Sequence, residues 1–107
     1  MALRRDGIRV RRGPLSLVYL DDGRDEVRVA YAMTKRIGTA VVRNRLRRRL
    51  RAIVAELGGH ASPPLPHGAL LISAGPEASR RRPDELRNDV ASLLAALETR
   101  RTGRVAP

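Results

Sequence analysis

The alternation of apolar and polar positions predicts two β-strands in the first third of the chain. Residues 15–20 are rich in β-forming side chains, with Leu15, Leu17 and Tyr19 on one face. Residues 27–33 alternate more clearly and place on one face Val27, Val29, Tyr31 and Met33. Asp21-Asp22-Gly23 between the two stretches is typical of a turn. We therefore predict that these two strands pair as an antiparallel hairpin.

Two later stretches repeat their apolar positions with the period of an α-helix. The first stretch runs from about Thr39 to Leu57. Thr39 is a suitable N-cap, and Gly58-Gly59 is a helix stop. The apolar side of this helix is formed by Val42, Leu46, Leu50, Ile53, Val54 and Leu57. The second begins at Asp84-Glu85, where carboxylates favour the helix dipole. Its apolar side consists of Leu86, Val90, Leu93, Leu94 and Leu97.

The remaining segments complete a small α+β pattern. Residues 60–68 carry three prolines and are predicted to be a loop, residues 69–74 a buried strand, and residues 79–83 a second loop. The order β-β-α-β-α, with or without a further element at the N-terminus, favours one mixed β-sheet with helices packed on one face. At 107 residues we expect a single domain, with a basic N-terminal arm (1–12), a globular core (13–98) and a mobile basic tail (99–107).

The charge of the chain indicates a polyanionic partner. Lysine and arginine number 22 against 11 acidic residues, which gives a formal net charge of +11. No apolar run approaches the roughly 18 residues of a membrane-spanning helix, so we expect a cytoplasmic protein with no membrane partner. The only aromatic residues are Tyr19 and Tyr31, which argues against a surface that stacks several bases.

The positive charge is concentrated in residues 35–51, which hold eight cations and no acid. On the predicted helix the side opposite the apolar stripe carries Asn44, Arg47, Arg48 and Arg51, while the flanks carry Arg43, Arg45 and Arg49. A solvated basic face normally includes acidic residues at helical spacing, and this one has none. Because arginine offers a fixed fork of donors that suits phosphate, we interpret this stretch as a nucleic-acid-binding helix.

The sequence shows no convincing catalytic or metal-binding group. His60 and His67 lie in the proline-rich loop without cysteine or a carboxylate at ligand spacing. The acids of residues 21–26 are explained by a solvated turn, and Asp84 and Glu85 by a helix start. We therefore predict no catalytic residue and no metal site in this chain.

The run from Lys35 to Arg51, with its Arg43-Asn44-Arg45 triplet after Lys35-Arg36-Ile37-Gly38, resembles the signature of the protein component of bacterial ribonuclease P. The flanking segments, residues 13–19, 28–30, 68–76 and 85–97, resemble that family in order and spacing. This resemblance implies a fold like the second domain of ribosomal protein S5, with a left-handed β-α-β crossover through the basic helix. The pattern of the residues alone would favour the common right-handed connection.

The resemblance also implies a function. The family's protein binds a large catalytic RNA, helps that RNA fold and hold Mg²⁺, and contacts the 5′ leader of precursor tRNA, while the RNA performs the hydrolysis. No protein partner is evident. The positions of this chain that match the family's RNA-binding motif are Lys35, Arg36, Arg43, Asn44, Arg45, Arg47, Arg48 and Arg51.

The chain departs from the family pattern near its N-terminus. Family members usually open with a longer helix whose phenylalanines help line the leader-binding cleft, and this chain has no phenylalanine. Leader contact would then shift to the strand side chains Val18, Tyr31 and Met33, with Arg11 and Arg12. The alternatives are a ribosome-associated or general RNA-binding protein, and an independent nuclease, which the missing catalytic cluster disfavours.

Overall fold

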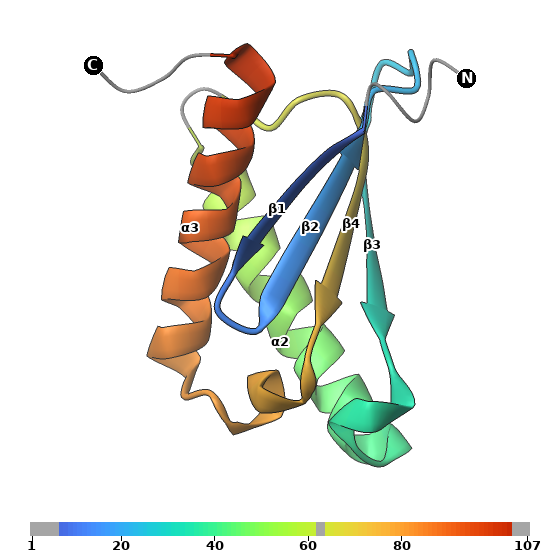
Figure 1. The fold of residues 1–107 in the computed structure, drawn as a ribbon, viewed down its shortest axis with the longest axis vertical. Coiled ribbons are helices and arrows are strands. Elements are labelled where there is room, and N and C mark those ends of the chain that lie inside the picture. The colour runs from blue at the N-terminus through green and yellow to red at the C-terminus, as the bar shows by residue number, and fades with distance from the viewer. Residues whose placement is uncertain (1–6, 62–63, 104–107) are drawn as a thin grey trace.

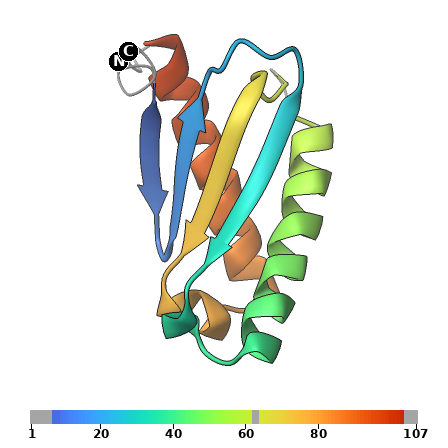
Figure 2. The ribbon, with the colours of Figure 1, turned by 90° about the vertical axis from the view of Figure 1, so that its right-hand side faces the viewer.

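A computed structural model describes residues 7–61 and 64–103 of the chain. Its elements are, in order, β1 (Ile8–Arg12), β2 (Leu15–Leu20), β3 (Val27–Met33), the 3₁₀-helix η1 (Lys35–Ile37), α2 (Ala40–Gly59), β4 (Gly68–Ala74), the 3₁₀-helix η2 (Pro76–Arg80) and α3 (Pro83–Thr102). Figure 1 shows the four strands as one sheet with both long helices beside it. Figure 2 shows that the helices cover one face of the sheet and leave the other face bare.

The sheet has the order β1-β2-β4-β3, so the predicted hairpin between β2 and β3 is wrong. Both strands have the predicted bounds, but β4 lies between them, antiparallel to β2 and parallel to β3. The sequence GALLISA of β4 is almost entirely apolar, as suits a central strand with neighbours on both sides. The segment of residues 21–26 is long enough to pass from β2 over the end of β4 to β3.

The predicted basic arm is wrong for residues 8–12, because they form the edge strand β1. β1 pairs antiparallel with β2 through the tight turn at Gly13-Pro14, where Gly13 has a positive φ of 56°. Val10 of β1 is buried against the core. The arginines on either side of Val10 obscure the period-two alternation of this strand in the sequence. The first six residues of the predicted arm lie outside the described residues.

The two helices begin at their predicted signals and both extend beyond the predicted ends. In α2 the Thr39 hydroxyl accepts a hydrogen bond from the Val42 backbone N–H (3.3 Å), as an N-cap does. α2 continues to Gly59, two residues past its predicted end. The Glu85 carboxylate at the start of α3 accepts from the Arg82 N–H (2.9 Å). α3 runs to Thr102, so the start of the predicted mobile tail is helical; residues 104–107 lie outside the described part.

The core lies between the sheet and the two helices. The buried side chains come from β2 and β4 on one side and from α2 and α3 on the other; those that are at most 1% exposed include Leu15, Leu17, Leu50, Leu70, Ile72, Leu86, Val90, Leu93 and Leu97. In α2, Leu46, Leu50 and Val54 form the buried stripe. The apolar period in the sequence therefore predicted the core-facing side of both helices correctly.

The β3-α2-β4 connection joins two parallel neighbouring strands by a left-handed crossover, as the resemblance implied. In Figure 1, β3 and β4 run down with β4 on the left of β3, and α2 lies behind the strands and returns upward. Gly68 opens β4 at φ 132°, and a Cβ there would lie 2.5 Å from the Leu20 carbonyl oxygen. Only glycine allows the returning chain to enter the sheet this close to β2.

Ion pairs join the two long helices and fix the segment before α3. The Glu56 carboxylate of α2 accepts from Arg87 of α3 at 2.5 Å, and this hydrogen bond lowers the pKa of Glu56. Arg81 pairs with Asp89 at 2.9 Å and 3.0 Å. This pair stands next to Gly13, where a Cβ would approach the Asp89 carboxylate to 3.1 Å. Residues 76–80, partly predicted as loop, form η2, with Ala78 buried.

We predict that Leu50→Ala lowers the free energy of unfolding by about 2–5 kcal/mol, because it leaves a cavity at the centre of the interface between α2 and the sheet. Val41→Ala is the matched control, since Val41 is 65% exposed on the same helix. Urea denaturation followed by circular dichroism measures both variants. Equal midpoints for the two variants would mean that α2 packs through a different side.

Candidate nucleic-acid interface

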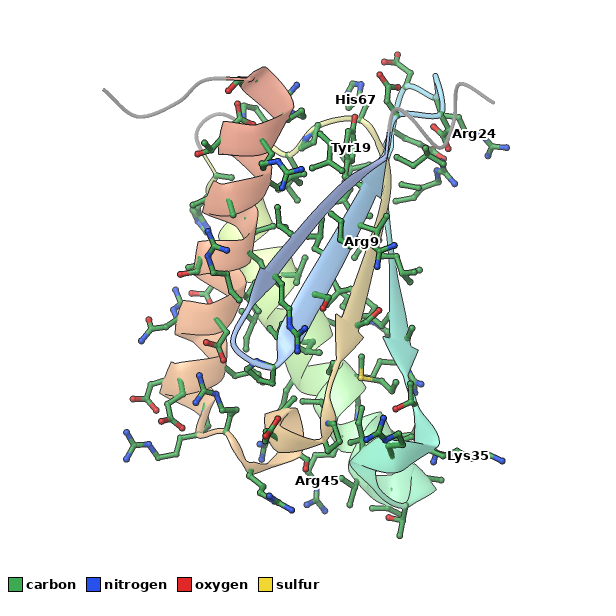
Figure 3. All side chains as sticks on the ribbon, viewed as in Figure 1. Arg9, Tyr19, Arg24, Lys35, Arg45 and His67 are labelled. Carbon is green, nitrogen blue, oxygen red and sulfur yellow. The ribbon has the colours of Figure 1, made fainter. Side chains whose placement is uncertain are left out.

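The segment before α2 is built to place cations beside the start of the helix. Ile37 of η1 is buried, which holds Lys35 and Arg36 at the surface. Gly38 reverses the chain at φ 150°, and a Cβ at this position would come within 3.3 Å of Val42. Figure 3 shows Lys35 and Arg45 at the same end of the molecule, where η1 meets the first turns of α2. Lys35 and Arg45, two positions that match the family motif, therefore lie at one end of the molecule.

The arginines of α2 differ in their freedom to bind a ligand. Arg45, Arg48 and Arg51 are exposed. Arg43 is half-buried and donates from its guanidinium to the Gly38 carbonyl at 3.0 Å, so part of it holds the loop before the helix. Arg47 is also half-buried and donates to the Asn44 side-chain oxygen at 2.7 Å. The expectation that Arg47 lies opposite the apolar stripe is therefore wrong, because it flanks the stripe.

Within the part of the chain that the structure describes, no ion pair involves any residue from 35 to 51. The acids form their ion pairs with other cations: Asp22 and Glu26 with Arg28, Asp89 with Arg81, and Glu56 with Arg87. The eight cations of this stretch therefore have no acidic partner among the described residues. Such a surface attracts a polyanion strongly and in a salt-dependent way. We call the exposed or half-buried residues of this surface the α2 surface: Lys35, Arg36, Arg43, Asn44, Arg45, Arg47, Arg48 and Arg51.

Tyr31 of β3 lies beside the α2 surface, in contact with Arg51. The Arg51 guanidinium carbon lies 6.0 Å from the centre of the Tyr31 ring, at the limit of a cation–π contact. Burial raises the pKa of the Tyr31 hydroxyl, and the positive charge of Arg51 partly opposes that rise. Tyr31 and Met33 both pack against the core from β3. The ring therefore supports the α2 surface from below and is only partly accessible.

The five residues predicted to contact a leader do not form one site. Register places Val18 beside Leu71 and Ala30 on the bare face of the sheet, whereas Tyr31 lies beside Ile72 on the face covered by helices. Met33 shares the Tyr31 side. Arg11 is on the bare face with Ser16, and Arg12 points to the helix side like Val10. The alternation within the strands already separates Val18 from Tyr31, because Val18 stands between the core-facing Leu17 and Tyr19 of β2.

Sequence reasoning missed Arg9 as a residue of the bare face. Its partner in register is Val18, so its side chain emerges next to that residue. Figure 3 shows the Arg9 side chain on the side of β1 that faces away from the helices. The alternation Ile8-Arg9-Val10-Arg11 before a Gly-Pro turn is the signal that could have identified it.

The histidines and acids of the described residues form no metal centre. No group of three or more His, Asp or Glu side chains among them is arranged to hold an ion. His60 bonds through Nδ1 to the Glu56 carbonyl oxygen (2.8 Å), and His67 Nδ1 lies 3.0 Å from an Asp25 carboxylate oxygen. Both rings are exposed. Neither helix in the described part of the chain has the length and apolarity needed to cross a lipid bilayer.

The structure defines a small basic α+β domain, with a four-stranded sheet and a cationic helix whose arginines form no ion pair among the described residues. Among such domains the chain belongs to the Ribonuclease P family, whose sequence profile matches residues 2–98. A relative from Thermus brockianus, named ribonuclease P protein component, is 44% identical over 69 residues. That match covers 64% of this chain and 39% of the relative, so the chain matches about two fifths of the relative's length.

Solved structures share the fold at low sequence identity. The RNase P protein of Staphylococcus aureus has a TM-score of 0.76 at 18% identity, covering 90% of this chain and 85% of that chain. A mutant of the same protein is described as having defective mRNA degradation activity. The Thermotoga maritima RNase P protein has a TM-score of 0.73 at 20% identity, covering 89% of this chain and 87% of that chain. These likenesses show the fold and confirm the four-stranded mixed sheet as that of the family.

We predict that Arg51→Gln raises the pKa of Tyr31, because it removes the cation that favours the tyrosinate. Tyr19 serves as the internal control: its ring lies on β2 and its hydroxyl donates to the His67 carbonyl oxygen at 2.6 Å. NMR titration of the two labelled tyrosine rings at high pH separates their responses. An unchanged Tyr31 titration would show that Arg51 does not lie over the ring in solution.

Proposed function

We propose that this chain is the protein subunit of bacterial ribonuclease P, a cytoplasmic ribonucleoprotein that removes the 5′ leader from precursor tRNA. In this proposal the α2 surface binds the catalytic RNA. The observation that carries it is the row of arginines on α2 that form no ion pair with any described acid, in a chain that belongs to this family. Guanidinium groups at such a surface bind phosphate oxygens with paired donors.

The bare face of the sheet is the better candidate for the leader. A single strand of RNA needs cations for its phosphates and an apolar floor for its sugars and bases. Arg9 and Arg11 supply the cations, and Val18 with the 40% exposed Leu71 supplies the floor. Tyr31 and Met33, which lie on the other face, are assigned to the support of the α2 surface instead. With no phenylalanine in the chain, charge contributes more than stacking to this contact.

Among the residues that the structure describes, no cluster of side chains fits a magnesium site. Mg²⁺ requires several oxygen ligands in octahedral order, and the acids that could supply them, Asp22, Glu26, Glu56 and Asp89, are engaged with arginines. The ions that the reaction requires are therefore assigned to the RNA subunit and the substrate. The protein contributes cationic side chains that reduce the repulsion between two polyanions as they come together.

Two alternative functions, general RNA binding and RNA degradation by the protein alone, would require other properties of the site. A general RNA-binding protein would bind many RNAs through the α2 surface without preference for a leader. An RNA-degrading activity of the protein alone, which the description of the Staphylococcus mutant raises for that protein, needs an activated water or nucleophile. The described residues offer no such arrangement. Sequencing of the RNA that copurifies with the protein separates the first alternative from the proposal.

We predict that Arg45→Gln with Arg48→Gln weakens binding to the catalytic RNA and flattens the slope of log affinity against log salt by roughly 1.4–1.8 units, for two lost phosphate contacts. Arg24→Gln with Arg101→Gln removes the same charge at the other end of the molecule and is the matched control. Filter binding over a range of salt concentrations gives both slopes. Equal slopes for the two pairs would move the RNA away from the α2 surface.

We predict that RNA-free protein cleaves neither precursor tRNA nor an unstructured messenger RNA, and that cleavage appears only when the catalytic RNA is added. The protein should increase the rate most at low Mg²⁺, since its arginines then supply charge neutralisation that the ion otherwise provides. Gel assays of leader release over a range of Mg²⁺ concentrations measure this benefit. Site-specific cleavage by nuclease-free, RNA-free protein would contradict the proposal.

A further inference from the structure

A second cationic site lies at the sheet edge farthest from β3, between β1 and α3. A groove of about 560 Å³ runs there. Val10 of β1 and the small residues Ala95 and Ala96 of α3 form its floor. Because these α3 residues are small, the helix and the edge strand leave a hollow where larger side chains would have filled the space. The hydroxyl residues Ser92 and Thr99 complete the α3 wall.

The rim of this groove is entirely cationic. It is lined by Arg9, Arg11, Arg12 and Arg100, all of them exposed, and none of the lining residues is acidic. Among the described residues no ion pair involves any of these four arginines. Their hydrogen bonds go to backbone carbonyls: Arg12 donates to the Arg11 oxygen (2.6 Å), and Arg100 donates across the groove to the Arg9 oxygen (3.1 Å). Each guanidinium keeps further N–H groups free for a ligand.

These contacts disfavour another β-strand as the occupant. β1 is an edge strand, and an unpaired edge is a template for a strand of another chain. Here the Arg9 carbonyl is already bonded by Arg100, and cationic side chains flank the edge on both faces. A second copy of this chain would bring four more arginines to the same place. A polyanion is the ligand that the charge of the groove complements.

We propose that the groove between β1 and α3 binds the phosphate backbone of a second RNA segment, separate from the segment held by the α2 surface. This inference rests on the proposed function and deepens it. β1 and β3 are the opposite edges of the sheet, and the α2 surface adjoins β3. The protein would therefore hold two RNA segments across the width of its sheet and fix the distance between them.

Arg12 lies on the helix side of β1, so it cannot contribute to the bare face, but it lines the groove. Its side chain points to the helix side of β1, where Arg100 of α3 comes towards the strand from the other wall. The two guanidinium groups thus come from segments 88 positions apart in the sequence, and only folding brings them to one groove. Arg9 and Arg11 connect the groove with the bare face around the edge of β1.

The test is an NMR titration of the full chain with a single-stranded 12-residue oligouridylate, followed through the backbone amides. We expect two groups of shifts, one at residues 43–51 and one at residues 9–12 and 92–100. In Arg12→Gln with Arg100→Gln the second group should disappear and the first should remain. Arg24→Gln with Arg80→Gln, which removes two exposed cations outside the groove, should keep both groups.

The outcomes separate this inference from the proposed function. Shifts at residues 43–51 without any at the groove, in the wild-type chain at saturation, would overturn the groove site alone. If residues 43–51 do not shift either, the α2 surface and the proposed function fail together. Shifts at β1 that grow with protein concentration in the absence of RNA would show self-association and would also overturn the inference. The wild-type titration decides these points whether or not the double variant folds.

The salt dependence of binding gives a second measure. Each phosphate contact to single-stranded RNA contributes roughly 0.7 to the slope of log affinity against log salt. Loss of Arg12 and Arg100 should therefore flatten the slope for the catalytic RNA by roughly 1.4 units, in addition to the effect of the α2 pair. A slope equal to that of the Arg24 and Arg80 control would count against a phosphate contact in the groove.

Discussion

The packing of α2 on the sheet through Leu46, Leu50 and Val54 is the interaction on which the basic surface depends. Eight cations within residues 35–51 repel one another, and without a fixed helix they would spread apart in solution. The buried leucines and valine offset that repulsion, because each buried side chain of this size contributes about 1.5–3 kcal/mol. The core therefore holds together a charge density that the surface residues alone would not keep.

The acids of the chain are placed where they stabilise the fold and do not weaken this surface. Glu56 joins α2 to α3 through Arg87, and Asp89 binds Arg81 beside the β1–β2 turn. Asp22 and Glu26 pair with Arg28 near the start of β3. The arginines therefore have two uses. Some form ion pairs that fix the elements, and those of residues 35–51 form none with the acids that the structure describes.

Because the helices cover only one face of the sheet, the other face remains available for contact with RNA. Both helices lie on one face, so the opposite face, with Val18, Leu71 and Ala30, is bare. α2 presents its cations beyond the β3 edge, and β1 with α3 forms a cationic groove at the other edge. A domain of this size thus offers separate surfaces on one rigid frame, each suited to a different stretch of a folded RNA.

The sequence by itself determined the local structure and the chemistry of the α2 surface. The period of Leu46, Leu50 and Val54 predicted both the helix and its buried side, and the absence of acids from residues 35 to 51 identified the ligand class. Both properties arise from residues that are close along the chain. The bounds of β2 and β3 were equally local, since alternation within each strand is enough to define it.

Tertiary structure alone decided the order of the strands and what that order brings together. The position of β4 between β2 and β3 depends on contacts between segments about 40 to 60 positions apart, which no local pattern records. For the same reason, the sequence could not show that Arg12 and Arg100 line one groove.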